Sequence, residues 1–307
     1  MDLKLRLKNE SASLRWGIIG CGRIAGDFAR ALKYCNRKHE IVAVASATSL
    51  ENAQNFASKH QLPSSTKAYG NYEELLKDPR VDVIYIANLK NSHHKWTLKG
   101  IEAHKAVLCE KPMGLDLTEL REMVEISRNR KIFLMEGIWT RCFPAYRKLR
   151  EIITSKQFGE VTYFYADFGL PLGTRIPLLN IGDYALQLAQ FVLSPKLVKT
   201  VNVNGQRDDN GNNIWLNITL DYGNGLKAVC VMDSRYVLPN SATVVFQRGH
   251  IRAPTSFLMP GRQESVHEFP LDDEKDREKF IHPNASGLRY EADHVHDCLS
   301  QGGSLIN

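Results

Sequence analysis

A glycine-rich turn near the start of the chain constrains the fold more than any other feature. The apolar run at residues 15–19 leads into Gly20-Cys21-Gly22-Arg23-Ile24-Ala25, and apolar residues then recur at helical spacing. In such a turn the first glycine permits a tight strand-to-helix connection, and the second lets the backbone approach a pyrophosphate. The helix N-terminus adds N–H groups and a partial positive charge. The pattern predicts a dinucleotide site made by Gly20, Gly22, Arg23, Ile24 and Ala25; the alternative is a tight turn that binds no ligand.

The first half of the chain alternates short apolar runs with segments of helical period. The runs that predict strands are residues 15–20, 40–47, 82–87, 106–109 and 131–135. Asp116 and Glu119 resemble a capping box at the start of the last helix of this half. Strands this apolar are covered on both faces, and helical connections make their sheet parallel. We therefore predict a doubly wound Rossmann domain at residues 14–140.

After residue 141 the pattern changes to one helix followed by β-rich runs. The helix is expected over residues 144–154, with Pro144 in its first turn. The β-rich runs cover residues 161–168, 198–205, 214–221, 228–234 and 242–247. Tyr222-Gly223-Asn224-Gly225 joins two of them as a hairpin turn. Residues 141–307 are expected to form an α+β domain with an open, mainly antiparallel sheet.

Length and composition fit two soluble domains. The chain has 307 residues, 43% of them hydrophobic and 24% charged, which excludes a disordered, collagen-like or membrane-spanning protein. The net charge of +6 is dispersed and is all that favours a nucleic-acid binder, so we expect neither a nucleic acid nor a membrane as partner. The six cysteines are widely spaced, and residues 1–8 alternate charge with leucine instead of forming a signal segment. We expect reduced thiols and a cytoplasmic location.

The end of the second apolar run indicates which nicotinamide cofactor the turn accepts. NAD enzymes usually carry an acidic residue there to bind the ribose 2′-hydroxyl. This chain has Ala45-Ser46-Ala47-Thr48-Ser49, with no carboxylate to repel a 2′-phosphate and with hydroxyls that can hydrogen-bond it. NADP is therefore favoured over NAD, with Ser46 and Thr48 at the phosphate and Arg23 as the positive partner. A solvated loop is the alternative.

Two further segments carry a family resemblance. Cys109-Glu110-Lys111-Pro112 ends the fourth apolar run, and Glu136-Gly137-Ile138-Trp139-Thr140-Arg141 follows the fifth. Together with the glycine turn, they resemble the Gfo/Idh/MocA oxidoreductases, and most closely the dimeric dihydrodiol dehydrogenases, which are also described as NADP-dependent D-xylose dehydrogenases. The resemblance extends from about Leu14 to Leu299 and is strongest through Tyr146. It implies hydride transfer from a trans-dihydrodiol or an aldopyranose to NADP, and a homodimer.

The resemblance also implies roles for particular residues. Lys111 corresponds to the lysine near the nicotinamide ribose and the reacting oxygen, and Tyr184 takes the acid/base position, with Asn180 where the family has an aspartate. A lysine at the carboxyl end of a parallel strand lies at the crevice where ligands bind. The alternative for Lys111 is a surface lysine in a loop, and the alternative for Tyr184 is a tyrosine of the core. Asn88 and Glu110 are the remaining residues expected to bind the cofactor. The residues expected to contact the substrate are His93, Trp139, Arg141 and Phe143. For His93 the alternatives are a helix cap, or His94 in its place, and for the aromatic residues the alternative is packing.

The sequence also departs from the family pattern. Asn180 carries no charge, the stretch 169–179 is short, and relatives continue beyond Asn307 into a strand-like run and a helix. A catalytically impaired dinucleotide-binding protein is therefore the second hypothesis. Glu291, His294, His296 and Asp297 lie close together in the sequence, but His294 and His296 do not share a helical face, so no metal site is expected.

Overall fold

The computed structural model describes residues 3–9, 11–171, 179–253, 280 and 285–303. The chain divides into two compact units, Met1–Cys142 with Leu271–Asn307, and Phe143–Pro270. The sequence pattern predicts that residues 141–307 all belong to the second domain. Helix α9 (Leu288–Gln301) belongs instead to the first unit, because its buried face, which includes Leu288, Val295 and Leu299, packs within that unit against α1 (Leu3–Leu7) and α2 (Arg23–Ala31).

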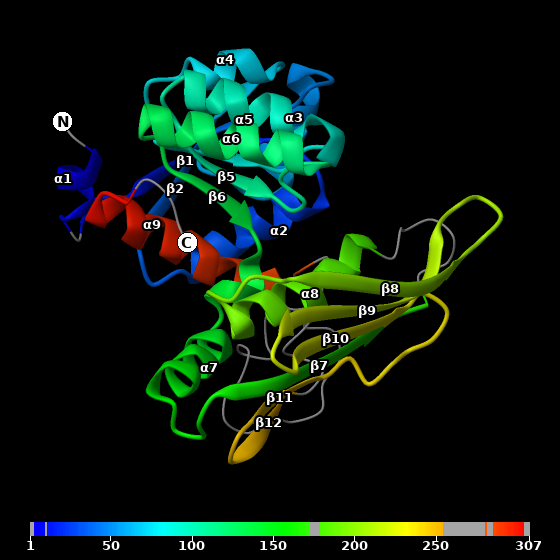
Figure 1. The fold of residues 1–307 in the computed structure, drawn as a ribbon. Coiled ribbons are helices and arrows are strands. Elements are labelled where there is room, and N and C mark those ends of the chain that lie inside the picture. Colours follow the sequence, from blue (N-terminus) through cyan, green and yellow to red (C-terminus); the bar gives the residue numbers. More distant parts are fainter. Residues whose placement is uncertain (1–2, 10, 172–178, 254–279, 281–284, 304–307) are drawn as a thin grey trace. The chain divides into compact units, whose positions relative to one another are not determined.

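The first unit contains a six-stranded parallel sheet (Figure 1). Its strands are β1 (Leu14–Ile19), β2 (His39–Ala45), β3 (Lys67–Tyr69), β4 (Val83–Ile86), β5 (Ala106–Glu110) and β6 (Leu134–Gly137). They lie in the order β3-β2-β1-β4-β5-β6, so the direction of succession reverses between β1 and β4. The carboxyl ends of strands at such a reversal form the ligand crevice of doubly wound folds. The predicted Rossmann architecture is confirmed.

Helices cover this sheet. Besides α1, α2 and α9, they are η1 (Leu32–Tyr34), α3 (Leu50–Lys59), α4 (Tyr72–Leu76), η2 (Lys90–Ser92), α5 (His93–Glu102), α6 (Leu117–Arg130), η3 (Trp139–Cys142) and η7 (Ala285–Gly287). Asp116 caps α6 by accepting from the backbone N–H groups of Thr118 and Glu119. The Glu119 carboxylate accepts from the Leu115 N–H instead of closing the box on Asp116.

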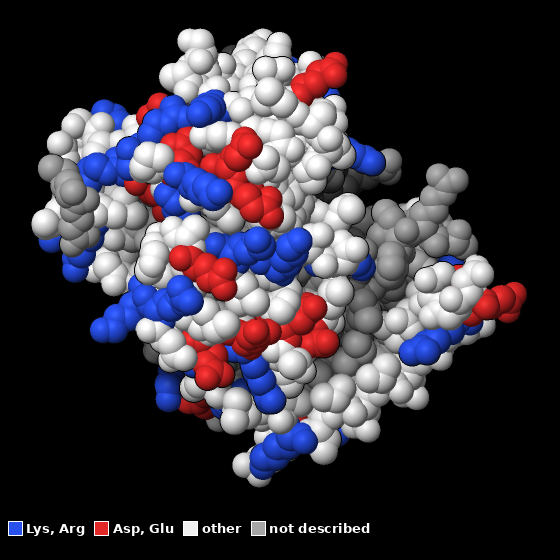
Figure 2. All heavy atoms as spheres, turned by 90° about the horizontal axis from the view of Figure 1, so that it is seen from above, with Lys and Arg blue, Asp and Glu red and all other residues white. Residues whose placement is uncertain are grey.

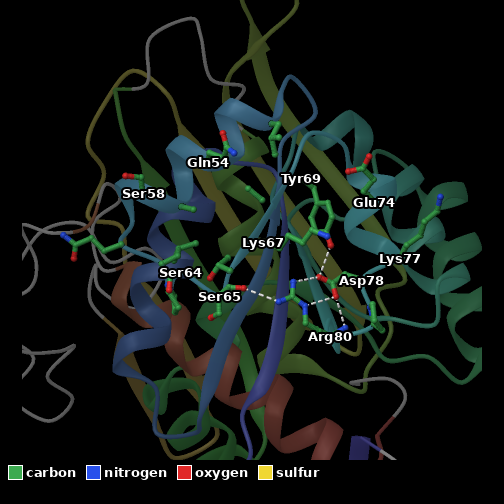
Figure 3. Close-up of a pocket in the computed structure, with 18 residues that line it drawn as sticks. Gln54, Ser58, Ser64, Ser65, Lys67, Tyr69, Glu74, Lys77, Asp78 and Arg80 are labelled. Atoms are coloured by element: carbon green, nitrogen blue, oxygen red, sulfur yellow. Dashed lines mark hydrogen bonds and ion pairs between the residues drawn. The ribbon is translucent and has the colours of Figure 1, made fainter.

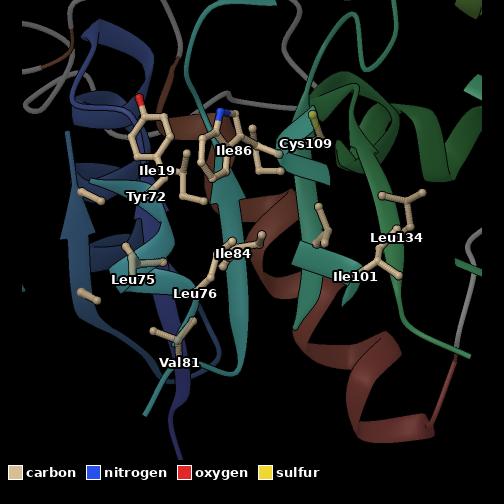
Figure 4. Packing of buried hydrophobic residues seen from close by; sticks show 14 of the residues in the cluster. Ile19, Tyr72, Leu75, Leu76, Val81, Ile84, Ile86, Ile101, Cys109 and Leu134 are labelled. Carbon is tan, nitrogen blue, oxygen red and sulfur yellow. The ribbon is translucent and has the colours of Figure 1, made fainter. Parts of the chain in front are cut away.

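One face of the sheet packs a continuous apolar core (Figure 4). Alternate strand residues such as Ile19, Ile84 and Ile86 meet Leu75 of α4 and Ile101 of α5 on that face. The opposite face buries the intervening residues, among them Ile18 and Tyr85, and the Tyr85 ring stacks on Phe28 with centroids 3.9 Å apart. Side chains buried on both faces explain why the strands appear as uninterrupted apolar runs.

The second unit contains the predicted open sheet. Its elements are α7 (Pro144–Ser155), β7 (Val161–Gly169), α8 (Leu179–Leu193), β8 (Thr200–Arg207), β9 (Asn213–Gly223), β10 (Leu226–Asp233), β11 (Ala242–Phe246) and β12 (Gly249–Ala253). The strand order is β12-β11-β7-β10-β9-β8, and every pair is antiparallel except β7 with β10. The β9–β10 hairpin has positive φ at Gly223, Asn224 and Gly225, as its sequence predicts.

Charged side chains of both signs are mixed on the face of the molecule seen in Figure 2. No broad area of one sign lies among the described residues of that face. None of the helices in the described ranges is both long and apolar enough to cross a membrane.

Candidate functional site

The glycine turn follows β1 at the point where the strand order reverses. Gly20 has φ +101°, and its N–H donates to the Ala45 carbonyl oxygen at 3.0 Å. A Cβ atom at Gly20 would lie 2.7 Å from the Ala87 carbonyl oxygen, a distance that side chains do not tolerate. The first glycine is therefore required by the close approach of β1 and β4, with or without a ligand.

Gly22 has no such internal requirement. It is the N-cap of α2 with extended φ and ψ of −86° and −173°, and it makes no side-chain capping hydrogen bond. A Cβ atom there would find nothing closer than the Ala87 carbonyl oxygen at 3.9 Å. Gly22 and Arg23 are exposed, while Ala25 is buried against the sheet. The open space over an uncapped helix N-terminus fits a pyrophosphate.

The end of β2 supplies hydroxyl groups. The hydroxyls of Ser46 and Thr48 lie 2.9 Å apart, and the Thr48 N–H donates to Ser46 Oγ at 3.3 Å. Ser46 is buried, whereas Thr48 is exposed and accepts from the Asn52 side chain. The turn therefore presents hydroxyls where an NAD enzyme usually presents a carboxylate.

Asn88 marks the end of β4. Neither polar atom of its side-chain amide is accessible to solvent, and neither has a hydrogen-bond partner among the described residues. An amide with unmet donor and acceptor capacity beside the glycine turn suits a polar ligand, since unpaired buried groups are costly.

The Glu110-Lys111-Pro112 segment at the end of β5 is braced by its neighbours. The Tyr85 hydroxyl donates to the Glu110 carboxylate, whose second oxygen accepts from the Lys111 N–H at 3.3 Å. Met113 N–H donates to the Glu136 carboxylate at 2.9 Å. The backbone of Lys111 is therefore held in place at the carboxyl end of β5.

His93 adds a further brace to that segment. Its Nδ1 lies 2.8 Å from the Pro112 carbonyl oxygen, and its Nε2 lies 3.2 Å from that of Asn88. The ring is 2% exposed, so both nitrogens face backbone acceptors and not solvent. His94 points elsewhere and contacts the Glu122 carboxylate at 2.8 Å. His93 thus ties the ends of β4 and β5 together.

The remaining predicted residues lie in three elements. Trp139 and Arg141 belong to η3, where Trp139 is buried, and Phe143 is the buried N-cap residue of α7. Tyr184 lies on α8 of the second unit and is 5% exposed. A Cβ atom at Gly182 would lie 2.0 Å from Met232 Sδ, so this glycine lets α8 approach β10 closely. Residues 172–178 and the Asn180 side chain lie outside the described part of the structure.

A cavity of about 1190 Å³ opens elsewhere in the first unit, between α3, β3 and α4 (Figure 3). Its lining includes no residue of the glycine turn or the Lys111 segment. Asp78 accepts from Arg80 Nη2 at 2.7 Å and from the Tyr69 hydroxyl at 3.0 Å, and Arg80 also donates to the Ser65 carbonyl oxygen. Burial opposes ionisation of Asp78, but these bonds outweigh it and lower its pKa. These groups hold β3 to its flanking loops.

One set of side chains has the composition of a metal site. Ligand atoms of Cys35, His39 and Asp293 lie within 4.8 Å of one another. The Trp16 indole N–H donates to His39 Nδ1 at 2.9 Å, which leaves the ring proton on Nε2, where Asp293 accepts it at 3.1 Å. A metal at Nε2 would have to displace that proton. The cluster instead anchors α9, because Asp293 also accepts from the Asn36 N–H.

The fold and the turn geometry define a protein with a dinucleotide-binding Rossmann domain and a second α+β domain. Residues 14–138 match the family model described as an oxidoreductase family with an NAD-binding Rossmann fold. The chain is 37% identical to trans-1,2-dihydrobenzene-1,2-diol dehydrogenase of Sus scrofa over 94% of this chain and 89% of the relative, and 36% identical to that of Homo sapiens over the same shares. It therefore belongs to the Gfo/Idh/MocA oxidoreductase family, as its motifs predict.

Solved structures agree at the level of the fold. A probable dehydrogenase from Thermotoga maritima superimposes with a TM-score of 0.76 at 22% identity, covering 94% of this chain and 90% of that one. A 3-ketoreductase from Actinomadura kijaniata, solved with NADP, gives a TM-score of 0.72 at 21% identity and the same coverage. The predicted combination of a parallel sheet with a second, mainly antiparallel sheet is confirmed.

Replacing Gly22 by valine tests the glycine turn. The side chain would occupy the space over the α2 N-terminus, so binding of NADP and NAD should both be lost. The melting temperature should change little, because apart from the two chain neighbours the nearest described atom is 3.9 Å from the new Cβ. Titration calorimetry and thermal unfolding measure the two effects. Gly20→Ala is the contrasting variant and should unfold at lower temperature. Retained affinity in Gly22→Val would contradict this site.

Proposed function

We propose that the chain is an NADP-dependent dehydrogenase that oxidises a trans-dihydrodiol, or an aldopyranose such as D-xylose, at a carbinol carbon. The observation that carries the proposal is the braced Lys111 at the carboxyl end of β5, at the same edge of the parallel sheet as a turn whose second glycine leaves space for a pyrophosphate. The names of the relatives, which match 94% of this chain, support the diol as substrate.

The residues present fit a nicotinamide dinucleotide. Gly20, Gly22, Ile24 and Ala25 would cradle the pyrophosphate, and the unpartnered Asn88 amide would hydrogen-bond the cofactor beyond it. Glu110 would act on the nicotinamide end of the cofactor indirectly, by holding the Lys111 backbone in place. Ser46, Thr48 and the exposed Arg23 would receive a 2′-phosphate. When bound, the cofactor supplies the hydride acceptor.

The chain's own side chains would handle the proton and the substrate oxygen. Tyr184 would accept the hydroxyl proton, as the family resemblance implies, and the Lys111 ammonium would stabilise the oxygen as it ionises. Asn180 would hydrogen-bond near that pair without adding the negative charge of the family's aspartate. Trp139, Arg141 and Phe143 would form the substrate wall. The contacts of His93 favour a positioning role through Pro112.

A homodimer is proposed through the second unit. Every residue of β8 is exposed, including Val201 and Val203, which are 57% and 56% exposed. An exposed apolar sheet margin in a monomer is a candidate interaction surface. The likeness of the chain to a family of dimers, noted from its motifs, points to a second copy as the occupant.

Cofactor preference follows from the end of β2. Because Ser46 and Thr48 stand where a carboxylate would repel a 2′-phosphate, NADP should bind at least about tenfold more tightly than NAD, a difference of about 1.4 kcal/mol. Calorimetric titration with both nucleotides measures it. Tighter binding of NAD would contradict the assignment of this strand end.

Lys111→Met should lower kcat by about 10² to 10³-fold, because it removes a preorganised charge that stabilises the ionising oxygen. The affinity for NADP should change far less. Lys95→Met, at an exposed lysine of α5, is the matched control and should leave both quantities near those of the parent. A Lys111→Met variant with near-normal kcat would reassign the lysine to a structural role.

Tyr184→Phe keeps the ring and removes the hydroxyl, so the fold should persist while oxidation falls by roughly 10² to 10⁴-fold. Tyr222→Phe is the control, since the buried Tyr222 hydroxyl has no hydrogen-bond partner among the described residues. Asn180→Asp should raise activity if the lost charge limits the enzyme, and change little if the short stretch 169–179 limits it. Full activity in Tyr184→Phe would contradict the acid/base assignment of Tyr184. NADPH binding without turnover of any diol or sugar would favour the impaired dinucleotide-binding protein.

A further inference from the structure

Helix α9 carries a carboxyl group into the interior of the first unit. Glu291 is 0% exposed, although it lies in the first turn of the helix, where acidic residues usually face solvent. Neither of its carboxylate oxygens has a hydrogen-bond partner among the described residues. The mechanism proposed above makes no use of this side chain.

Gly137, at the end of β6, leaves the room that Glu291 fills. A Cβ atom on Gly137 would lie 3.7 Å from Glu291 Oε2, 3.3 Å from the Cys109 carbonyl oxygen and 3.5 Å from Glu110 Cα. The Glu291 carboxyl therefore rests against the carboxyl ends of β5 and β6, where the Lys111 segment begins. A residue from near the C-terminus thus lies next to the strand end that carries the predicted catalytic lysine.

Two titratable groups of the sheet interact electrostatically with this carboxyl, Glu110 on β5 and Tyr85 on β4, while β6 presents the uncharged Gly137. Glu110 accepts from the Tyr85 hydroxyl and from the Lys111 N–H. Burial raises the pKa of Glu291 well above the ordinary carboxyl value, and the Glu110 charge raises it further. Burial, followed by Glu110 and Glu291, likewise raises the pKa of Tyr85.

An ionised Glu291 would be a buried charge without a partner, which is among the most costly arrangements in a protein interior. A neutral carboxylic acid instead has one proton to donate, and acceptors at the strand ends are the Glu110 carboxylate and the Cys109 carbonyl oxygen. Two negative charges held close together in an interior are unfavourable, so the nearby Glu110 carboxylate also favours a neutral Glu291.

We propose that Glu291 is a positioning residue for the Lys111 segment. The neutral acid on α9 supports Glu110 from the interior of the first unit and so keeps the Lys111 ammonium directed to the crevice. The role rests on the proposed function of Lys111. Loss of the proton would place a second negative charge beside Glu110 and draw the ammonium back toward the strand ends. Oxidation should therefore decline at alkaline pH as Glu291 ionises.

The first arm of the test is stability, which needs no substrate. A carboxyl whose pKa is raised on folding contributes stability that is present below its unfolded pKa and is lost as pH rises toward its folded pKa. Above about pH 5, the unfolding constant of the parent should therefore increase relative to that of Glu291→Gln, by up to about tenfold per pH unit. Glu125→Gln, at an exposed position of α6, should show no such pH dependence. If the unfolding constants of Glu291→Gln and the parent changed with pH in parallel, the proposed neutral state of Glu291 would be wrong.

The second arm is the pH profile of oxidation. Glu291→Gln keeps a neutral donor, so the alkaline decline of kcat in the parent should be absent from this variant. Glu291→Ala removes the donor and should lower kcat at every pH by up to about 10²-fold, with a much smaller change in KM for NADP. An unchanged decline in Glu291→Gln would overturn the positioning role even if the stability arm succeeds. If the chain oxidises no diol or sugar, the proposed function fails, while the stability arm still decides whether Glu291 holds a proton.

Discussion

The close approach of β1 and β4 sets the geometry on which the predicted cofactor site depends. Gly20 fits between the strands only because it has no side chain, since the Ala87 carbonyl oxygen lies 2.7 Å from the position that a Cβ atom would take. The N–H of Ala87 in turn donates to the Ile19 carbonyl oxygen at 2.8 Å. These contacts bring the N-terminus of α2 beside Asn88, at the reversal of strand order where doubly wound proteins bind nucleotides.

The lysine of the second motif is fixed by residues that are distant in sequence. Tyr85, His93 and Glu136 hold the segment around it from β4, α5 and β6. A charged group that must stabilise a developing charge acts best when its surroundings are already arranged, because no reorganisation then accompanies the reaction. The bracing therefore matters to the proposed chemistry as much as the lysine itself.

The sequence predicted the features that depend on local pattern. Apolar runs located most strands, and the glycine turn and the hairpin at Gly223-Asn224-Gly225 appear as expected. β3 was missed because its three residues, Lys67–Tyr69, are too short to show a period. The expected strand at 131–135 begins only at Leu134, since Lys131 takes φ +55° to end α6.

Long-range contacts were beyond what spacing can reveal. Glu291 was grouped with neighbouring histidines, although it shares the buried helix face with Leu288, Val295 and Leu299, and nothing local indicates that Gly137 leaves room for its carboxyl. His93 was expected at the substrate, but its two carbonyl contacts come from Asn88 and Pro112 on separate loops. Such contacts depend on the assembled sheet.

Transfer of a labelled hydride tests the central claim most directly. The purified 307-residue chain would be incubated with NADP⁺ and a trans-dihydrodiol or D-xylose that carries deuterium on the carbinol carbon, and the nucleotide would be analysed by mass spectrometry. The account predicts reduced NADP that carries deuterium at nicotinamide C4, with formation that depends on Lys111. Reduced nucleotide without deuterium, or tight NADP binding with no reduction by any diol or sugar, would contradict it.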